Sequence, residues 1–375
     1  MDQKIDIDFV LVTSAKDYSN EALSGAGVCL KYALYADEMN LTDYASDLWV
    51  YGAIGLIADM SDMSVPENRY IAHRGLAQFK NPMVKKMVGN YAFDSQSVSF
   101  SIGPLVNAAM RMHENEKAMN VFLAEDEDEI NELVKDLKDC RERQNEAVAE
   151  MLDDLLEQGE AQLDRKCMFF ILNNDTDAEV TGLIGNKLLA MYQRPLFILR
   201  LRDRQYAGSM RSIGTESLLE IANSTGLCLC QGHPNAAGAF IQEDKFEQFK
   251  DVIEEKLKDI EFSVNIEADI ELSPEQINEN LIKQLTAINR ISGTGFKPVK
   301  VLVRTNDYEV GTFSTKKHLK VVDESGLLIV KWNTDEWKTM KNDKPLVAVG
   351  TLSSPYYGRV KYLQLTTDDF TQQND

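Results

Sequence analysis

The chain has 375 residues, of which 44% are hydrophobic, and it carries a formal net charge of −20. This length favours two or three domains with ordinary globular cores. No apolar run reaches the length of a bilayer span and the first residues show no signal-peptide core, so we expect a soluble, cytoplasmic protein. The acidic charge argues against non-specific binding of nucleic acid, unless a local basic groove or a divalent metal offsets it.

The five cysteines are Cys29, Cys140, Cys167, Cys228 and Cys230. Their odd number and the absence of CxxC spacing argue against a disulfide framework and against a zinc site. Cys228 and Cys230 alternate along an expected strand, so we predict buried free thiols there.

Residues 1–125 show an α/β pattern. FVLVTS (9–14) predicts a short strand, and the glycine turn that follows leads into an expected helix. The apolar segment 48–60 has no period that decides between a buried helix and a strand. In either form it delivers Asp59 to a surface cleft, where Asp59 and Asp62 suit a hard metal ion. The alternative interpretation is a helix cap or a solvated turn.

Residues 126–165 carry apolar side chains at helical spacing, with a polar remainder and no proline. The acidic start suits a helix N-terminus. We predict one long helix that connects two domains. A partner-binding coiled coil is the less favoured alternative, because the apolar seam is interrupted between Glu142 and Asn145.

Residues 166–265 alternate between strand and helix patterns, which indicates a compact α/β domain. Within it, GSMRSI supplies Arg211 and Ser212 after an expected strand. An arginine beside small residues suits bidentate binding of phosphate. An ordinary turn with an exposed arginine is the alternative.

The segment GHPNAAG (232–238) follows in the same domain. Proline is favoured in the first turn of a helix, so the segment predicts a helix start whose free amides face an anion. Gly232 permits unusual backbone angles, and His233 adds a hydrogen-bond donor. The alternative is a histidine packed at a tight turn.

After about residue 296, five short β-rich segments separated by turns favour a small barrel such as an OB-fold, which often binds single-stranded nucleic acid. Aromatic and basic residues lie close together in this sequence and suit a groove on which bases stack. They are Trp332, Trp337, Tyr356, Tyr357, Lys316, Lys317, Lys320, Arg359 and Lys361. The alternative is core tryptophans beside a solvated lysine face.

Taken in order along nearly the whole chain, these pieces resemble RecJ, a single-strand-specific DNA exonuclease family of the DHH phosphoesterase superfamily. LSGAGVCLKYAL is similar to the glycine turn and helix after the catalytic DHH segment, and AIGLIADMSDMSVPENRYIAHRGL is similar to the last catalytic motif. FSIGPLVNAAMRM resembles the family's I-x-P-R-L-N-A-A-G-R segment. RSI and GHPNAAG resemble the two signature segments of the DHH-associated domain, and HLKVV and GTLSSPYYGRVKYLQLTTDDF resemble the OB-fold.

The resemblance implies an α/β protein in four parts. These are a partial DHH phosphoesterase domain (1–125), a connector helix (126–165), a DHH-associated domain (166–265), and a linker with a C-terminal OB-fold β-barrel (266–375). It also implies metal-dependent hydrolysis of single-stranded DNA with Mn²⁺ or Mg²⁺, which activate a bound water. Asp59 aligns with the catalytic, metal-binding aspartate of the family. The substrate-binding positions that the resemblance implies are Asn107, Arg111, Arg211, Ser212, Gly232 and His233.

The family's metal site also uses an N-terminal D-x-D pair, another aspartate and a D-H-H triplet, and we expect this chain to lack them. None of its four histidines stands in a D-H-H triplet. We therefore expect little or no nuclease activity from the isolated chain. It is then an incomplete piece, or one part of a split enzyme whose second chain supplies these motifs. The alternatives are a non-catalytic module that binds single-stranded DNA or a single-strand-binding or replication protein, and a small phosphoester or cyclic-dinucleotide hydrolase of the same superfamily.

Overall fold

The computed structural model describes residues 18–173, 180–214, 216–262, 266–313, 317–334, 336–342 and 344–372. The chain divides into two compact units, one formed by Met1–Pro104, Ala124–Val134 and Ile266–Asp375 and the other by Leu105–Leu123 and Lys135–Asn265. The four domain ranges predicted from the sequence remain predictions. The strand expected over residues 9–14 lies outside the described residues. Within the described parts of the chain, no helix has both the length and the apolar character that a membrane crossing needs.

Helices form the N-terminal part of the first unit: α1 (Gly25–Asn40), α2 (Trp49–Ala58), α3 (Pro66–Leu76), α4 (Pro82–Val88) and α5 (Ser95–Ser97). The apolar segment whose period was undecided is α2. It is buried on most sides, and a helix without a polar face loses the sequence period that would reveal it. Gly75 of α3 allows the close approach of α2, because a Cβ at this position would lie 2.2 Å from the carbonyl oxygen of Trp49.

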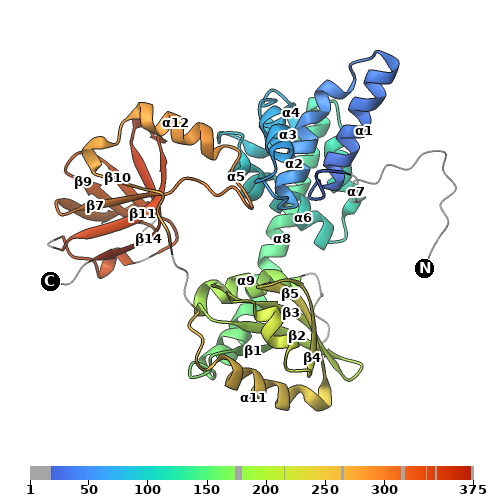
Figure 1. Cartoon of the computed structure of the whole chain (residues 1–375), viewed down its shortest axis with the longest axis vertical. Coiled ribbons are helices and arrows are strands. Elements are labelled where there is room, and N and C mark those ends of the chain that lie inside the picture. Colours follow the sequence, from blue (N-terminus) through green and yellow to red (C-terminus); the bar gives the residue numbers. More distant parts are fainter. Residues whose placement is uncertain are drawn as a thin grey trace. The chain divides into compact units, whose positions relative to one another are not determined.

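The second unit is built on a five-stranded sheet in the order β1-β2-β3-β5-β4 (Figure 1). Its strands are β1 (Met168–Ile171), β2 (Leu196–Arg202), β3 (Gln205–Arg211), β4 (Cys228–His233) and β5 (Ala236–Gln242). Strand β1 runs parallel to β2, and the other neighbours are antiparallel. The α/β pattern predicted for this part of the chain is therefore confirmed.

Helices cover both faces of this sheet. They are α9 (Thr181–Tyr192), α10 (Leu218–Asn223) and α11 (Phe246–Leu257), together with α8 (Glu127–Glu160). Phe169 and Phe197 pack on one face with α10 and α11, whereas Phe170 and Ile198 pack on the other with α8 and α9. The long helix predicted over 126–165 is confirmed as α8, which has 34 residues.

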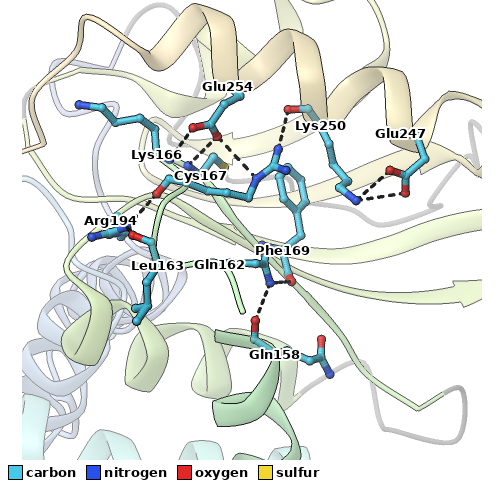
Figure 2. Close-up of polar contacts among 11 residues, drawn as sticks. Gln158, Gln162, Leu163, Lys166, Cys167, Phe169, Arg194, Glu247, Lys250 and Glu254 are labelled. Atoms are coloured by element: carbon cyan, nitrogen blue, oxygen red, sulfur yellow. Dashed lines mark hydrogen bonds and ion pairs between the residues drawn. The ribbon is translucent and has the colours of Figure 1, made fainter. Parts of the chain in front are cut away.

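Strand β1 lies at the edge of the sheet, and two glutamine side chains complete its hydrogen bonding. The Gln158 amide donates to the Ile171 carbonyl at 3.0 Å and accepts from the Ile171 N–H at 2.8 Å. Gln162 does the same for Phe169, at 2.8 and 2.9 Å (Figure 2). The end of α8 thus takes the place of a neighbouring strand and satisfies an edge that would otherwise be open.

The segment between α8 and β1 is also bound by α11. The carboxylate of Glu254 in α11 accepts hydrogen bonds from the backbone N–H groups of Lys166 and Cys167 (Figure 2). Arg165 donates to the Lys250 carbonyl at 3.0 Å. The chain between α8 and β1 is therefore tied to both the helix it leaves and the helix that covers the sheet.

Removing the two glutamine amides is expected to open β1 locally. In the double variant Gln158→Ala/Gln162→Ala, the free energy of local opening should fall by about 1–2 kcal/mol, because four backbone hydrogen bonds are exchanged for weaker ones with water. Hydrogen exchange of the Phe169 and Ile171 amides measures this loss directly. Gln193→Ala removes an exposed glutamine side chain that donates to the nearby Ala190 carbonyl, and it should leave exchange in β1 unchanged. Equal protection of β1 in the double variant and the parent chain would contradict the assignment.

The C-terminal part of the first unit is a seven-stranded sheet in the order β6-β7-β11-β14-β10-β9-β8. Its strands are β6 (Ile270–Leu272), β7 (Val301–Thr305), β8 (Tyr308–Thr312), β9 (Leu319–Asp323), β10 (Leu328–Lys331), β11 (Leu346–Ser353) and β14 (Gln364–Gln372), with β12 (Tyr356–Tyr357) and β13 (Val360–Lys361) as a separate pair. The helix α12 (Glu279–Asn289) packs Ile282 and Leu285 into the core of this sheet. The predicted all-β character is confirmed.

The predicted closure of this sheet into a barrel is not found among the described residues, because β6 and β8 end the strand order without pairing. The pairing of β11 with β14 shifts register between Val349 and Gly350, and a strand bends at such a bulge. A Cβ on Gly350 would lie 2.1 Å from the Thr366 carbonyl oxygen, so only glycine fits this bend. The barrel was predicted from the number of β-rich segments, and that number does not determine whether the two outer strands pair with each other.

Candidate functional site

The segment GHPNAAG forms a β-hairpin and not a helix start, which corrects the sequence-based prediction. Strand β4 ends at His233 and β5 begins at Ala236, so Pro234 and Asn235 form the turn. The helix preference of proline is local, whereas pairing of β5 with both β3 and β4 involves the whole strand and outweighs it. Gly232 has a φ of +140°, a region that is essentially restricted to glycine.

A helix start does lie beside this turn, but the turn uses its amides. The N–H of Leu219 in α10 donates to the Pro234 carbonyl at 2.9 Å, and the N–H of Leu218 donates to the Asn235 side chain at 3.2 Å. The Asn235 amide donates in turn to the Gly214 carbonyl at 3.1 Å. Asn235 therefore ties the hairpin turn to the loop before α10, a role that the sequence pattern did not reveal.

The sheet places two of the predicted site residues, Arg211 and His233, on one face. Ala236 of β5 is paired on one side with Arg211 of β3 and on the other with His233 of β4. Residues directly opposite one another in antiparallel strands point to the same face, so the Arg211 and His233 side chains share one face, about 10 Å apart at the backbone. The next row on this face is Ser209, Gly238 and Gln231.

This face is open over β4 and β5. Gln231 and His233 are exposed, and Ala236 and Gly238 between the strands are small and partly exposed. Arg211 and His233 therefore border a shallow surface at which an extended ligand can lie close to the backbone. We call the face formed by Ser209, Arg211, Gln231, His233, Ala236 and Gly238 the hairpin face.

Arg211 is held against α9 while its charge stays uncompensated by a carboxylate among the described residues. Its Nε donates to the Asn186 side chain at 2.9 Å and one terminal nitrogen donates to the Met210 carbonyl at 2.7 Å. Burial lowers the pKa of the Arg211 guanidinium, but the usual arginine pKa lies so far above neutral pH that the side chain stays cationic. Such a half-buried cation is suited to an anionic ligand.

Two glycines of α9 make room for this arginine. A Cβ at Gly182 would lie 2.6 Å from the second terminal nitrogen of Arg211, and a Cβ at Gly185 would lie 3.1 Å from its Cγ. Thr181 adds a hydroxyl contact to Ser209 at 2.9 Å. These α9 residues were not recognised from the sequence. The signal was the series of small residues in TGLIGN (181–186), which places Thr181, Gly182 and Gly185 on one side of a helix.

Ser212 follows β3 and is buried. Its N–H donates to the Asn235 carbonyl at 3.0 Å, and its hydroxyl donates to the Ile213 carbonyl at 3.3 Å. In this conformation the Ser212 backbone holds the hairpin turn through Asn235. The predicted contact of Ser212 with a substrate remains a prediction.

Asp59 is the exposed C-cap residue of α2 in the first unit. In the turn that follows, hydrogen bonds from the hydroxyl and the backbone N–H of Ser64 lower the pKa of Asp62. Behind this turn, Asn68 is fully buried and donates to the Asp62 carbonyl at 2.9 Å, while it accepts from Asn20 at 2.8 Å. The conformation of the turn that carries Asp59 is therefore fixed by a buried polar contact.

The described residues do not fit a metal pair. Within them, no three histidine, cysteine, aspartate or glutamate side chains are grouped so that they can hold a metal ion. A pair of divalent ions is held by several carboxylate or other protein ligands besides water, so Asp59 alone is insufficient. The sequence contains three D-x-D spacings, and the one nearest its start, Asp6 and Asp8, lies outside the described residues.

Asn107 and Arg111 lie on α6 (Gly103–Arg111), which is followed by α7 (Asn115–Leu123). They are four residues apart and so share one side of the helix; Asn107 is exposed and Arg111 is half-buried. Their predicted role in substrate binding is not tested by these contacts and stays a prediction.

Adding one methyl group at Gly232 is expected to disturb the hairpin. In Gly232→Ala the new Cβ would lie 2.9 Å from the Ala237 Cα at a backbone angle that L-residues rarely adopt, so the free energy of unfolding should fall by about 1–3 kcal/mol. Thermal denaturation measures the change. Gly238→Ala is the matched control in the same hairpin, because the nearest atom to its Cβ is 3.8 Å away. Similar melting of both variants would show that the Gly232 conformation is not required.

The chain is similar to known proteins along most of its length. Residues 164–259 match the DHHA1 domain family. The Bacillus subtilis protein YorK, whose name describes an SPbeta prophage-derived single-strand DNA-specific exonuclease, is 27% identical over 330 residues, which cover 78% of this chain and 57% of that protein. The single-stranded-DNA-specific exonuclease RecJ of Thermus thermophilus is 30% identical over 247 residues, which cover 62% of this chain and 35% of that protein.

The fold has a counterpart among solved structures. The crystal structure of RecJ from Thermus thermophilus in complex with Mn²⁺ matches with a TM-score of 0.76 at 23% identity, over 96% of this chain and 55% of that chain. This likeness confirms the expected α/β fold class. The chain spans between about a third and three fifths of the length of these relatives.

Proposed function

We propose that this RecJ-like chain of the DHH superfamily binds the sugar–phosphate backbone of single-stranded DNA in the cytoplasm, with the hairpin face of its DHHA1 domain as the phosphate-binding site. One observation carries the proposal: Arg211 is cationic, half-buried and without a carboxylate partner among the described residues, on the same open face as His233. A guanidinium supported from behind by Asn186 can present its remaining donors to phosphate oxygens.

The acidic residues that give the chain its net negative charge are not spread evenly over its surface. Strands β3, β4 and β5 contain neither aspartate nor glutamate. The phosphate backbone would therefore meet a locally neutral to positive face, although the chain as a whole is acidic. This local composition supports nucleic-acid binding in spite of the net charge.

A second surface for bases is supported by an aromatic cluster in the C-terminal sheet. The Phe313 ring stacks on Trp332 with centroids 5.5 Å apart, and His318 and Tyr357 pack around them. Trp332 is 41% exposed and Lys320 lies 6.0 Å from the Phe313 ring centroid. Exposed rings beside a cation suit the stacking of unpaired bases.

Two members of the predicted base-stacking groove have other roles in the structure. Trp337 packs against the core of the sheet, as the alternative interpretation held. Lys361 forms an ion pair with Glu279 at 3.1 Å, which reduces its availability to phosphate. Lys316 lies outside the described residues. The cluster of Phe313, His318, Trp332 and Tyr357 therefore carries the stacking proposal.

The proposed reaction of the complete enzyme is metal-dependent hydrolysis of phosphodiester bonds, for which Mn²⁺ or Mg²⁺ would activate a water and stabilise phosphoryl oxygens. The described residues contribute DNA binding and Asp59, but they do not form the metal site. We therefore propose that catalysis needs further metal-ligating residues, from a second chain or from parts of this protein outside the described residues. A non-catalytic module that holds single-stranded DNA or a replication protein is the second candidate, and the aromatic cluster and the hairpin face would serve it equally well.

Fluorescence anisotropy with a labelled single-stranded oligonucleotide tests the binding proposal. We expect binding at low salt that weakens as salt rises, because phosphate contacts release counterions. Absence of binding at low salt would contradict DNA binding and favour a protein partner.

A further inference from the structure

Two thiols lie side by side behind the hairpin face. The sulfur atoms of Cys228 and Cys230 are 3.8 Å apart, on alternate residues of β4 and therefore on the same side of this edge strand. They point away from the hairpin face, toward the core beneath α10. The other cysteines belong to different elements of the chain: Cys29 is exposed on α1, and Cys140 and Cys167 are buried.

The two thiols differ in accessibility and acidity. Cys228 is half-buried, whereas Cys230 is only 3% exposed. The hydrogen bond from Cys230 lowers the pKa of Cys228, and the same hydrogen bond together with burial raises the pKa of Cys230. The more accessible thiol is thus the more acidic one, and this is the division between an attacking and a resolving thiol in disulfide exchange.

We propose that Cys228 and Cys230 are a modification site at which an intrastrand disulfide forms reversibly by exchange with a low-molecular-weight disulfide such as oxidised glutathione. The Cys228 thiolate attacks one sulfur of the reagent, whose S–S bond breaks and releases one thiolate. Cys230 gives up its proton and attacks the Cys228 sulfur, which releases the second thiolate. One protein S–S bond forms, the reagent bond breaks, two electrons pass to the reagent, and the two protons leave with its thiols.

The strand can close this bond with a limited movement. An S–S bond is about 2.05 Å long, so the sulfurs must approach by roughly 1.8 Å. Alternate residues of a strand have Cα atoms about 6.6 Å apart, near the upper end of the range for disulfides, so closure must tighten the pleat. Strand β4 ends the strand order beside β5, and on its outer side the Asn223 side chain holds the Cys230 backbone, so closure must shift this side-chain contact and need not break a second strand pairing.

Formation of the disulfide would change the position of the turn beside His233. The Cys228 thiol donates to the Ala222 carbonyl of α10 at 3.2 Å, and this contact is lost in the disulfide. The Asn223 side chain of α10 binds both the N–H and the carbonyl of Cys230, at 2.7 and 3.0 Å. Because the other end of α10 holds the Pro234–Asn235 turn, a shift of β4 against α10 moves the turn that positions His233.

Peptide mapping tests the disulfide without reference to DNA. The full chain with Cys29→Ser, which removes the exposed thiol, is treated with oxidised glutathione and then alkylated and digested with trypsin. Residues 212–245 form one tryptic peptide that contains Cys228 and Cys230 as its only cysteines. We expect this peptide to lose two hydrogens and to resist alkylation, and dithiothreitol to reverse both effects. Alkylation of both cysteines, or a stable glutathione adduct on Cys228 beside an alkylated Cys230, would overturn the proposal.

Single variants separate the two roles. In Cys230→Ser the resolving thiol is gone, so a glutathione adduct should accumulate on Cys228. In Cys228→Ser the remaining buried Cys230 should form no adduct. The opposite pattern would overturn the assignment of Cys228 as the attacking thiol, and failure of both variants to react would overturn exchange at this site.

The effect on binding rests on the proposed function and is measured separately. Oxidation should weaken the binding of a single-stranded oligonucleotide about tenfold, within the usual range for coupled sites, and Cys228→Ser/Cys230→Ser should abolish this redox dependence. Disulfide formation with unchanged affinity would overturn the coupling alone. Failure of the reduced chain to bind DNA would overturn the proposed function and leave the mapping result intact.

Discussion

Arg211→Gln is expected to weaken the binding of a single-stranded oligonucleotide by about 10- to 100-fold. A hydrogen bond to a charged group contributes about 1.5–3 kcal/mol, and each 1.4 kcal/mol corresponds to a factor of ten in affinity. Arg211 is held in place by Asn186 and the Met210 carbonyl before any ligand arrives, so little entropy is lost when phosphate binds. Titration by fluorescence anisotropy at several salt concentrations measures the loss and should also show a salt dependence reduced by about one counterion.

Arg204→Gln is the matched control. Arg204 lies just before β3, at the opposite end of this strand from Arg211, and its side chain is 86% exposed. The variant changes the net charge by the same amount at the same strand, so a general electrostatic effect would lower affinity equally in both. Equal losses in Arg204→Gln and Arg211→Gln would contradict a localised phosphate site.

Arg211→Lys separates charge from geometry. It keeps the positive charge but loses the planar fork and the Nε donor that bonds Asn186. An affinity between those of the parent chain and Arg211→Gln is expected. Full retention of binding would show that charge alone is recognised, and thermal denaturation of each variant establishes that the fold is preserved.

Much of the fold follows from local patterns in the sequence. Helix α8 was predicted because its apolar residues repeat at helical spacing without proline, and this signal does not depend on tertiary contacts. Strands β1 and β2, which contain Phe169 and Phe197, are recognisable in the sequence as short apolar runs. The segment of α2 was ambiguous, since burial on nearly every side removes the period that separates a helix from a strand.

The site was less predictable because its geometry depends on strand pairing. Arg211 and His233 were identified as phosphate-binding residues, but their common neighbour Ala236 is revealed only by the order β3-β5-β4. Pro234 suggested a helix from local preference, and the pairing of β4 with β5 overrode it. The support of Arg211 by Gly182 and Gly185 involves residues more than 25 positions away in the sequence, which no local pattern relates.

The purified chain alone, supplied with Mn²⁺ or Mg²⁺, is expected to leave 5′-end-labelled single-stranded DNA undegraded even where it binds it. Hydrolysis by a metal pair requires several carboxylate or histidine ligands around both ions, and the described residues place Asp59 without such companions. Gel electrophoresis of the labelled DNA over time gives the readout.

The variant Asp59→Asn tests whether any degradation that is observed depends on the predicted metal ligand. Because Asp59 is exposed at the end of α2, the substitution should preserve folding and oligonucleotide binding. Metal-dependent degradation by the parent chain that disappears in Asp59→Asn would show that the chain completes a metal site by itself. If degradation arises only when a second polypeptide with a D-H-H triplet is added, and again requires Asp59, the second polypeptide supplies the metal ligands that accompany Asp59. Loss of activity in Asp59→Asn with unchanged affinity, set against loss of affinity in Arg211→Gln, would then assign metal binding and DNA binding to different residues of this chain.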